Sequence, residues 1–320
     1  MNTVSIILPC YNEQESLPLY FKAVDPVLAG IEDFSFRFIL VNDGSKDKTP
    51  EVMEKLYKER DDITIVNESR NFGQNAALSA GLSLVKDDFC IIMDVDLQDP
   101  VEVIEGICKK FQEGYDVVNP HRADRKEDTF FKRTTAKMFY TFLNSLEGQE
   151  VVPENVNCYR GLSKKAVDLI NSLEEKDRYL ISEIPYIGLK TATIDFDRAK
   201  RDAGTSKYSL SKLILHALNV ISSTTASPLY LPLKSSLVLF PINLLGTLAF
   251  FVLWILALNA TIPNVGIYST LLILFVALLS LSVILFFIGI LGVYLHNILI
   301  NTRKRPSFII ESVESKEKKQ

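Results

Sequence analysis

The stretch IIMDVDLQDP, residues 91–100, joins an apolar run to a cluster of acids. A buried strand is not expected to end in three aspartates, Asp94, Asp96 and Asp99, without a function. On an extended segment, side chains two positions apart point to the same face, so Asp94 and Asp96 would repel each other unless a cation lies between them. Two carboxylates and the amide of Gln98 are oxygen ligands that suit Mg2+ or Mn2+. The stretch therefore predicts a metal site of Asp94, Asp96 and Gln98, with a strand followed by a plain acidic turn as the alternative.

Working outward from this stretch, apolar runs alternate with segments of helical pattern. The predicted strands are residues 4–8, 36–41, 63–66 and 89–93, and the predicted helices are residues 16–27, 47–57 and 74–85. This alternation indicates an α/β fold with a mostly parallel sheet, whose site lies along the carboxyl ends of the strands. Polar residues follow each strand, so we expect them to line one cleft. No Walker or G-x-G-x-x-G phosphate loop is present, which leaves metal and side chains to hold a diphosphate.

The segment 235–302 contains no Asp, Glu, Lys or Arg. It divides at residues 259–264 into two apolar stretches, 237–258 and 267–295, each longer than the ~20 residues that a helix needs to cross a bilayer. The pattern predicts a two-helix transmembrane hairpin over residues 235–300. A buried helical pair in a soluble protein is the alternative.

Basic residues flank the predicted hairpin on both sides and are missing from its connecting loop. They are Lys207, Lys212 and Lys234 before the first span, and Arg303, Lys304 and Arg305 after the second. Under the positive-inside rule this predicts a multi-pass protein of the cell membrane, with its N-terminal domain and both termini cytoplasmic. The first residues, MNTVSIILPCYNE, carry no basic region and are typical of a strand rather than a signal peptide.

The cysteine content and the net charge argue against several classes of protein. Four cysteines without paired spacing fit a reducing compartment and argue against disulfides and zinc. A net charge of −4 gives no reason to expect a nucleic-acid partner. The oligomeric state stays open, with a homo-oligomer among the options.

Two further segments carry basic residues next to apolar faces. Residues 129–147 predict a helix on which Arg133 and Lys137 lie one turn apart, a pair that needs an anion or solvent beside it. Residues 209–221 have apolar positions at helical spacing, which predicts an interfacial helix on the bilayer surface within a linker over residues 209–234. A buried core helix is the alternative for that segment.

Four motifs, read in order, carry a resemblance to a known family. They are VSIILPCYNE (4–13), VNDGS (41–45), SRNFG (69–73) and MDVDLQDP (93–100). In this order they resemble the glycosyltransferase family 2 enzymes with a GT-A fold. The segment RAKRDAGTSKYSLSKL (198–213) and the paired C-terminal spans make the chain similar to the polyprenyl-phosphate branch, which contains bactoprenol glucosyltransferases and dolichol-phosphate mannose synthases.

The resemblance implies a role for each motif. The implied donor-binding residues are Pro9, Tyr11, Glu13, Asp43, Arg70, Asn71 and Asp94. Asp94, Asp96 and Gln98 would hold the ion, and Asp94, Asp96, Arg133 and Arg201 are the implied catalytic residues. The implied ligands of the acceptor phosphate are Arg122, Arg133, Lys137, Arg201, Ser206 and Lys207.

One position departs from the family pattern. Where relatives carry Gly-Asp-Phe-Arg-Leu, residues 157–161 read NCYRG, so Cys158 stands where the family has its proposed base aspartate. A lipid phosphate is already mostly dianionic at neutral pH, because its second pKa is about 6, and it needs no base to act as a nucleophile. We therefore expect transfer to survive without a carboxylate at this position.

The resemblance implies an enzyme that moves a hexose, with inversion, from a nucleotide sugar to undecaprenyl phosphate at the lipid bilayer. UDP-glucose is the favoured donor, and N-acetylglucosamine or mannose donors are alternatives. A processive polysaccharide synthase is disfavoured because no Q-x-x-R-W motif is present. A catalytically silent membrane scaffold that binds nucleotide sugar is the alternative from another class. The expected domains are a catalytic domain (1–208), the linker, the hairpin, and a charged cytoplasmic tail (301–320).

Overall fold

The computed structural model describes residues 1–122, 158–173, 180–196, 238, 241, 245, 265–302 and 306–316. The chain divides into two compact units. The first is Met1–Tyr208 together with Arg303–Gln320, and the second is Ser209–Thr302.

The first unit is built on one 8-stranded sheet in the order β7-β5-β6-β4-β1-β2-β3-β8. Its strands are β1 (Asn2–Cys10), β2 (Phe34–Asn42), β3 (Ile63–Glu68), β4 (Phe89–Ile92), β5 (Val117–Arg122), β6 (Arg160–Ser163), β7 (Thr191–Phe196) and β8 (Ile310–Ser315). The central strands β4, β1, β2 and β3 are parallel, while β6 and β8 run antiparallel to their neighbours β4 and β3. All four carboxyl ends of the parallel strands therefore meet at one edge of the sheet.

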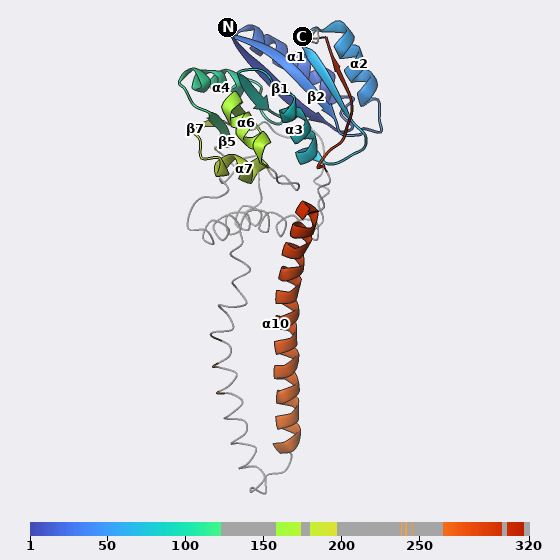
Figure 1. Ribbon diagram of the computed structural model, residues 1–320, viewed down its shortest axis with the longest axis vertical. Helices are drawn as coiled ribbons and strands as arrows, with labels where there is room; N and C mark the ends of the chain where they lie inside the picture. Colours follow the sequence, from blue (N-terminus) through green and yellow to red (C-terminus); the bar gives the residue numbers. More distant parts are fainter. Residues whose placement is uncertain are drawn as a thin grey trace. The chain divides into compact units, whose positions relative to one another are not determined.

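Helices cover both faces of this sheet, as Figure 1 shows. They are α1 (Ser16–Ala29), α2 (Thr49–Glu59), α3 (Gln74–Ser83), α4 (Val103–Gln112), α6 (Lys164–Ser172) and α7 (Leu180–Tyr186). Side chains alternate along β1, so Ile6 packs in one core with α1, α2 and α4, and Ile7 packs in the other with α3, α6 and α7. Strands buried on both faces are continuous apolar runs, which is why β1 and β2 read so clearly in the sequence.

The predicted α/β fold with a mostly parallel sheet is confirmed through the first 92 residues. Every predicted strand and helix of that part exists, with ends shifted by a few residues. The strand predicted over residues 89–93 ends one residue early, at Ile92. The predicted helix over residues 129–147 and the interfacial helix over residues 209–221 lie outside the described residues.

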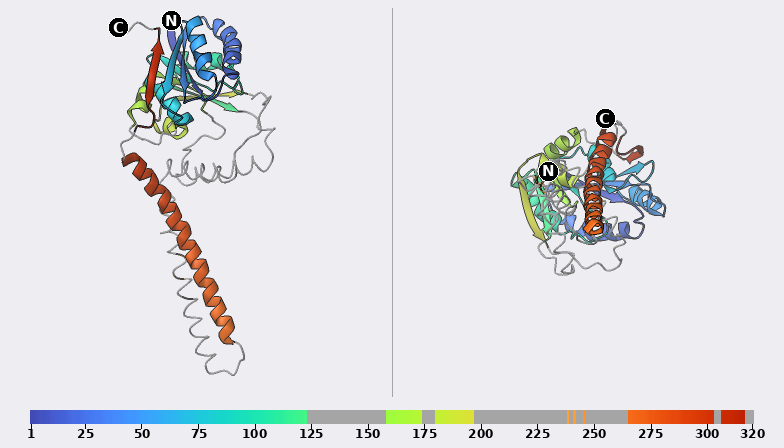
Figure 2. Two further views of the ribbon diagram at one scale, coloured as in Figure 1. Left: turned by 90° about the vertical axis from the view of Figure 1, so that its right-hand side faces the viewer. Right: turned by 90° about the horizontal axis from the view of Figure 1, so that it is seen from below.

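The expected charged tail is in part a strand of the sheet. β8 pairs with β3 in antiparallel register, from Thr64 opposite Ser315 to Glu68 opposite Ile310. In Figure 2 its red arrow lies along the sheet edge. An edge strand pairs on one side only, so a half-polar sequence such as IESVES can form it.

In the second unit the structure describes one long helix, α10 (Val265–Thr302). It contains the second predicted span, residues 267–295, but many of its side chains lie outside the described set. Counting only what is described, no helix qualifies by length and apolar character as a membrane span. The transmembrane hairpin and the cytoplasmic orientation therefore stay predictions.

Candidate active site

The site begins where β1 and β2 end, because hydrogen bonds join the two loops that follow them. The backbone N–H of Asn12 donates to the Ser45 hydroxyl (3.1 Å), and that of Glu13 donates to Thr49 Oγ1 (2.7 Å). In return, the N–H of Lys46 donates to the Asn12 side-chain carbonyl (2.8 Å). Asn12 adopts a left-handed backbone with φ of 59°, a conformation in which asparagine is among the commoner residues. Glu13 is thereby held in a fixed position at the edge of the sheet.

Asp43, the first residue after β2, anchors the loop between β3 and α3. Its carboxylate accepts hydrogen bonds from the backbone N–H of Phe72 (2.6 Å) and of Gly73 (3.1 Å), and from the Asn71 side-chain amide (3.0 Å). Its side chain is 3% exposed. Asp43, which the resemblance implies to bind the nucleotide sugar, therefore has a structural role: its carboxylate holds the turn that follows Arg70 and contains Asn71.

Gly44 brings the two loops into contact. Its φ is +60°, and a Cβ at this position would overlap the backbone nitrogen of Asn71 and lie 2.6 Å from the carbonyl carbon of Arg70. Only glycine fits both the conformation and the space. The guanidinium of Arg70 lies over the ring of Phe72 at 4.4 Å from its centroid, a cation–π contact that fixes the arginine near the loop.

The acid cluster follows β4 as a turn rather than as an extended segment. Leu97 has a φ of +55°, an uncommon value for a leucine, and it separates Asp96 from Gln98. The Gln98 N–H and amide donate to the Asp96 carboxylate at 3.1 and 2.5 Å. The amide of Gln74 donates to Asp94 (2.8 Å) from the first turn of α3. Because the turn breaks the strand, the same-face argument for Asp94 and Asp96 does not hold as stated.

Electrostatic couplings show which parts of the site lie close together. Burial raises the pKa of Glu13, and the charge of Asp96 raises it further, although a hydrogen bond with Ser16 opposes both. Burial, then Glu13 and Asp94, hold the pKa of the Cys10 thiol well above its usual range. The end of β1 and the turn after β4 therefore face each other, as expected for neighbouring parallel strands.

Cys158, directly before Tyr159 and β6, is coupled to the same acids. Burial raises the pKa of its thiol to about 12, with Asp94 and Asp99 acting in the same direction and Arg160 opposing them. At neutral pH the thiol therefore keeps its proton. The position at which the family resemblance implies a base therefore holds a neutral group in this protein.

The structure places nine of the predicted site residues at or just beyond the carboxyl ends of the four parallel strands. They are Pro9, Tyr11, Glu13, Asp43, Arg70, Asn71, Asp94, Asp96 and Gln98. Arg122 is the last residue of β5, and its side chain is outside the description. The rest of the predicted acceptor set, Arg133, Lys137, Arg201, Ser206 and Lys207, lies outside the described residues.

Two polar residues of the site were missed by the sequence reasoning. Gln74 was assigned only to a helix, although its place right after Gly73 puts it at the helix start that faces Asp94. Glu68 was assigned no role, because the strand predicted there ended at residue 66, yet it is a 3% exposed carboxyl group. Nothing in the local sequence indicates that burial, because it depends on β8 and α3 covering β3.

The fold of the first unit defines a class of protein, the proteins with a GT-A fold. The crystal structure of glucosyl-3-phosphoglycerate synthase from Mycobacterium tuberculosis with Mn2+, UDP and phosphoglyceric acid matches with a TM-score of 0.51 and 20% identity. The match covers 71% of this chain and 78% of that chain. A second structure of the same enzyme, with Mn2+, UDP-glucose and phosphoglyceric acid, also has a TM-score of 0.51, at 19% identity. At this identity the likeness shows the fold alone.

The family follows from sequence. The model of glycosyl transferase family 2 matches residues 5–170, so the chain belongs to that family and is a glycosyltransferase. An uncharacterized glycosyltransferase of Synechocystis sp. is 35% identical over 314 residues, 97% of this chain and 95% of that one. A prophage bactoprenol glucosyl transferase homolog of Escherichia coli K12 and a bactoprenol glucosyl transferase of Shigella phage SfV are each 33% identical, over 97% and 98% of this chain and 99% of their own lengths.

Proposed function

We propose that this glycosyltransferase moves glucose from UDP-glucose to the phosphate of undecaprenyl phosphate, with inversion at C1, at the cytoplasmic face of the cell membrane. The observation that carries the proposal is the 33% identity to bactoprenol glucosyl transferases over nearly the whole of both chains, including the uncharged segment 235–302. A soluble transferase would have no need of that segment.

The donor would bind at the edge where the four parallel strands end. In this proposal Pro9, Tyr11 and Glu13 border the base and ribose, and Arg70 and Asn71 lie beside the diphosphate. Tyr11 is 42% exposed, which leaves its ring accessible to a ligand. Support for a UDP-sugar comes from the structural neighbours crystallised with UDP and UDP-glucose.

Asp94, Asp96 and Gln98 would hold a divalent cation, Mg2+ or Mn2+. Within the described part of the chain no three His, Cys, Asp or Glu side chains gather as a metal cage. A cation that bridges a substrate diphosphate needs only one or two protein carboxylates, and the exposed carboxylate of Asp96 fits that requirement. When bound, such an ion stabilises the negative charge that develops on the leaving diphosphate.

The acceptor side of the proposal rests on charge. Arg122, Arg133, Lys137, Arg201, Ser206 and Lys207 are the proposed ligands of the lipid phosphate. They would let two anions, the acceptor phosphate and the donor diphosphate, approach each other. The acceptor phosphate is a dianion, and one of its oxygens attacks C1. The neutral thiol of Cys158 removes no proton from the phosphate.

The membrane location is part of the same proposal. Among the described side chains of α10, Ile273, Ile284, Phe286 and Ile288 are each more than half exposed, an arrangement that suits lipid better than water. An interfacial helix over residues 209–221 would keep the active site at the depth of the lipid headgroups.

The direct test is a transfer assay with the purified full-length chain in detergent. Labelled UDP-glucose, UDP-N-acetylglucosamine and GDP-mannose are offered together with undecaprenyl phosphate and Mn2+, and the lipid product is identified by mass spectrometry. A glucosyl lipid phosphate supports the proposal. A product carrying only N-acetylglucosamine or mannose would correct the donor, and a chelator should abolish the reaction in either case.

Cys158 motivates the second candidate, a silent scaffold that binds nucleotide sugar without turning it over. The same assay separates the two functions, because a scaffold retains labelled donor on the protein but releases no glycolipid and no free UDP.

A further inference from the structure

Two acid side chains lie next to each other beneath the loop that follows β3. β2 and β3 are parallel, with Asn42 opposite Asn67 and the two side-chain amides hydrogen bonded at 2.9 Å. The next residues along the two strands are Asp43 and Glu68. Both are 3% exposed, and Val41 and Val66, two positions before them, lie in the core that α3 covers.

The two carboxyl groups differ in their partners. The Asp43 carboxylate accepts from the backbone of Phe72 and Gly73 and from the Asn71 amide. Neither side-chain oxygen of Glu68 has a hydrogen-bond donor in the described part of the chain. A buried carboxylate without a donor, placed beside a second carboxylate, is strongly unfavourable, whereas a protonated one can donate to its neighbour.

We infer that Glu68 is a positioning residue, which keeps its proton in the folded protein and donates it as a hydrogen bond to Asp43. Asp43 then holds the turn of residues 71–73, so the proton on Glu68 supports the loop that the proposed function assigns to donor binding.

The electrostatics of the pair agree with this geometry. Burial raises the pKa of Glu68 to about 8, and the neighbouring carboxylate of Asp43 acts in the same direction. Among the described residues of the elements that flank Glu68, α3 contains no charged residue, and the residue opposite on β8 is Ile310. Arg70 and Glu311 are nearby in sequence and exposed. Loss of the proton near this pH would place two carboxylates together and loosen the turn.

The test uses the full-length chain with Glu68→Gln, which keeps a hydrogen-bond donor but cannot ionise, and Glu68→Leu, which has no donor. Glu183→Gln, a second buried glutamate at 3% exposure, is the matched control. Thermal unfolding is followed from about pH 6 to about pH 9.5, and the Michaelis constant for UDP-glucose is measured over the same range.

The expected sign follows from proton linkage. Glu68 has its pKa raised from 4.5 to about 8 on folding, so its stabilising contribution is lost as pH rises towards about 8. The Tm of Glu68→Gln minus the Tm of the unmodified chain should therefore increase between about pH 6 and about pH 8, by about 2 °C or more. Its donor KM should stay flat where that of the unmodified chain rises at least about twofold above pH 8. Glu68→Leu should show a raised donor KM at every pH.

A Glu68→Gln chain whose Tm follows pH as the unmodified chain does would overturn the inference, as would equal behaviour of the Gln and Leu variants. The unfolding measurement needs no substrate. It therefore decides the inference even if no transfer is detected, while absence of transfer in the unmodified chain counts against the proposed function alone.

Discussion

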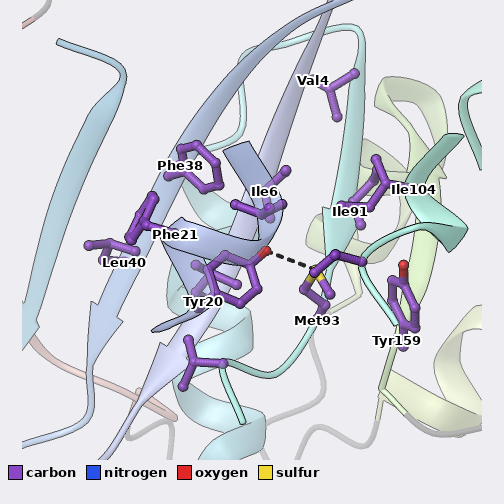
Figure 3. Close-up of a cluster of buried hydrophobic side chains, with 14 of the residues drawn as sticks. Val4, Ile6, Tyr20, Phe21, Phe38, Leu40, Ile91, Met93, Ile104 and Tyr159 are labelled. Carbon is purple, nitrogen blue, oxygen red and sulfur yellow. Dashed lines mark hydrogen bonds between the residues drawn. The ribbon is translucent and has the colours of Figure 1, made fainter. Parts of the chain in front are cut away.

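The hydroxyl of Tyr20 donates a hydrogen bond to the sulfur of Met93 at 2.9 Å, inside the core and directly before the acid turn (Figure 3). Both side chains are fully buried. Through this contact α1 fixes the end of β4, so the position of Asp94 depends on a helix that is remote in sequence.

Tyr20→Phe should therefore lower the free energy of unfolding by about 1 kcal/mol, because a buried donor and acceptor lose each other while the ring still fills the core. Denaturant unfolding measures the change. Tyr186→Phe, at a residue 78% exposed, is the control and should leave stability unaltered. A Tyr20→Phe chain as stable as the unmodified one would show that the hydroxyl contributes nothing.

Asp96→Ala and Cys158→Ala should have opposite consequences for glucosyl transfer. The first removes the exposed carboxylate proposed to hold the cation and should lower kcat on the order of a thousandfold. The second removes a neutral thiol, whose raised pKa of about 12 bars it from acting as a base, and should retain transfer within about tenfold.

Both variants are assayed with labelled donor in membranes, and Asp168→Ala on α6 serves as the surface control. Equal loss in the Asp96 and Cys158 variants would contradict the roles given to them.

Gly44→Ala should damage the site more than an equivalent change elsewhere. Gly44 and Gly114 both have positive φ, at 60° and 78°, but a Cβ on Gly114 meets nothing within 4 Å, whereas one on Gly44 overlaps the backbone of the loop at Asn71. The conformational strain of about 1–2 kcal/mol is common to both variants, and the overlap is specific to Gly44. Unfolding and donor KM are compared in the two, and only Gly44→Ala should raise KM. Equal KM values in the two variants would mean that the loop at Asn71 moves to accept the extra methyl group without any change in donor binding.

A chain that ends at residue 305 should lose stability and donor affinity together. It lacks β8, which covers the edge of β3, and it lacks the Ile309 carbonyl that accepts the Ser69 N–H at 3.0 Å. An open edge strand also favours aggregation, which light scattering detects. A chain that ends at Lys316 keeps the strand and the ion pair of Lys316 with Asp61 (2.9 Å) and should behave as the full chain does. If the two truncations behave alike, β8 is dispensable.

The elements that could be predicted from the sequence are those in which the order of apolar and polar residues matches the burial of each side chain in the structure. β1 and β2 are continuous apolar runs because both faces of the strands are covered, and the polar residues after them mark the site edge. β8 escaped prediction because an edge strand half open to water carries no apolar run. β6 escaped because it is short and includes Gly161, where a Cβ would overlap Ile107, a contact visible only in three dimensions.

The site shows the same division. Asp94 and Asp96 follow β4 as expected, but the strand ends at Ile92 and Leu97 is left-handed, so the two acids lie in a turn and not on an extended segment. The burial of Glu68 depends on which strands become neighbours. The role inferred for its proton depends on Asp43, 25 positions earlier in the chain. Such pairs are set by topology rather than by spacing.

The place of β8 in the chain has a consequence for biosynthesis. The ribosome makes residues 310–315 only after the long uncharged segment, yet those residues complete the sheet begun at Asn2. Until they emerge, β3 has one bare edge and Ser69 lacks its backbone acceptor. A nascent chain would thus complete the loop after β3 only once the uncharged segment has been made, which ties completion of the sheet to the arrival of β8.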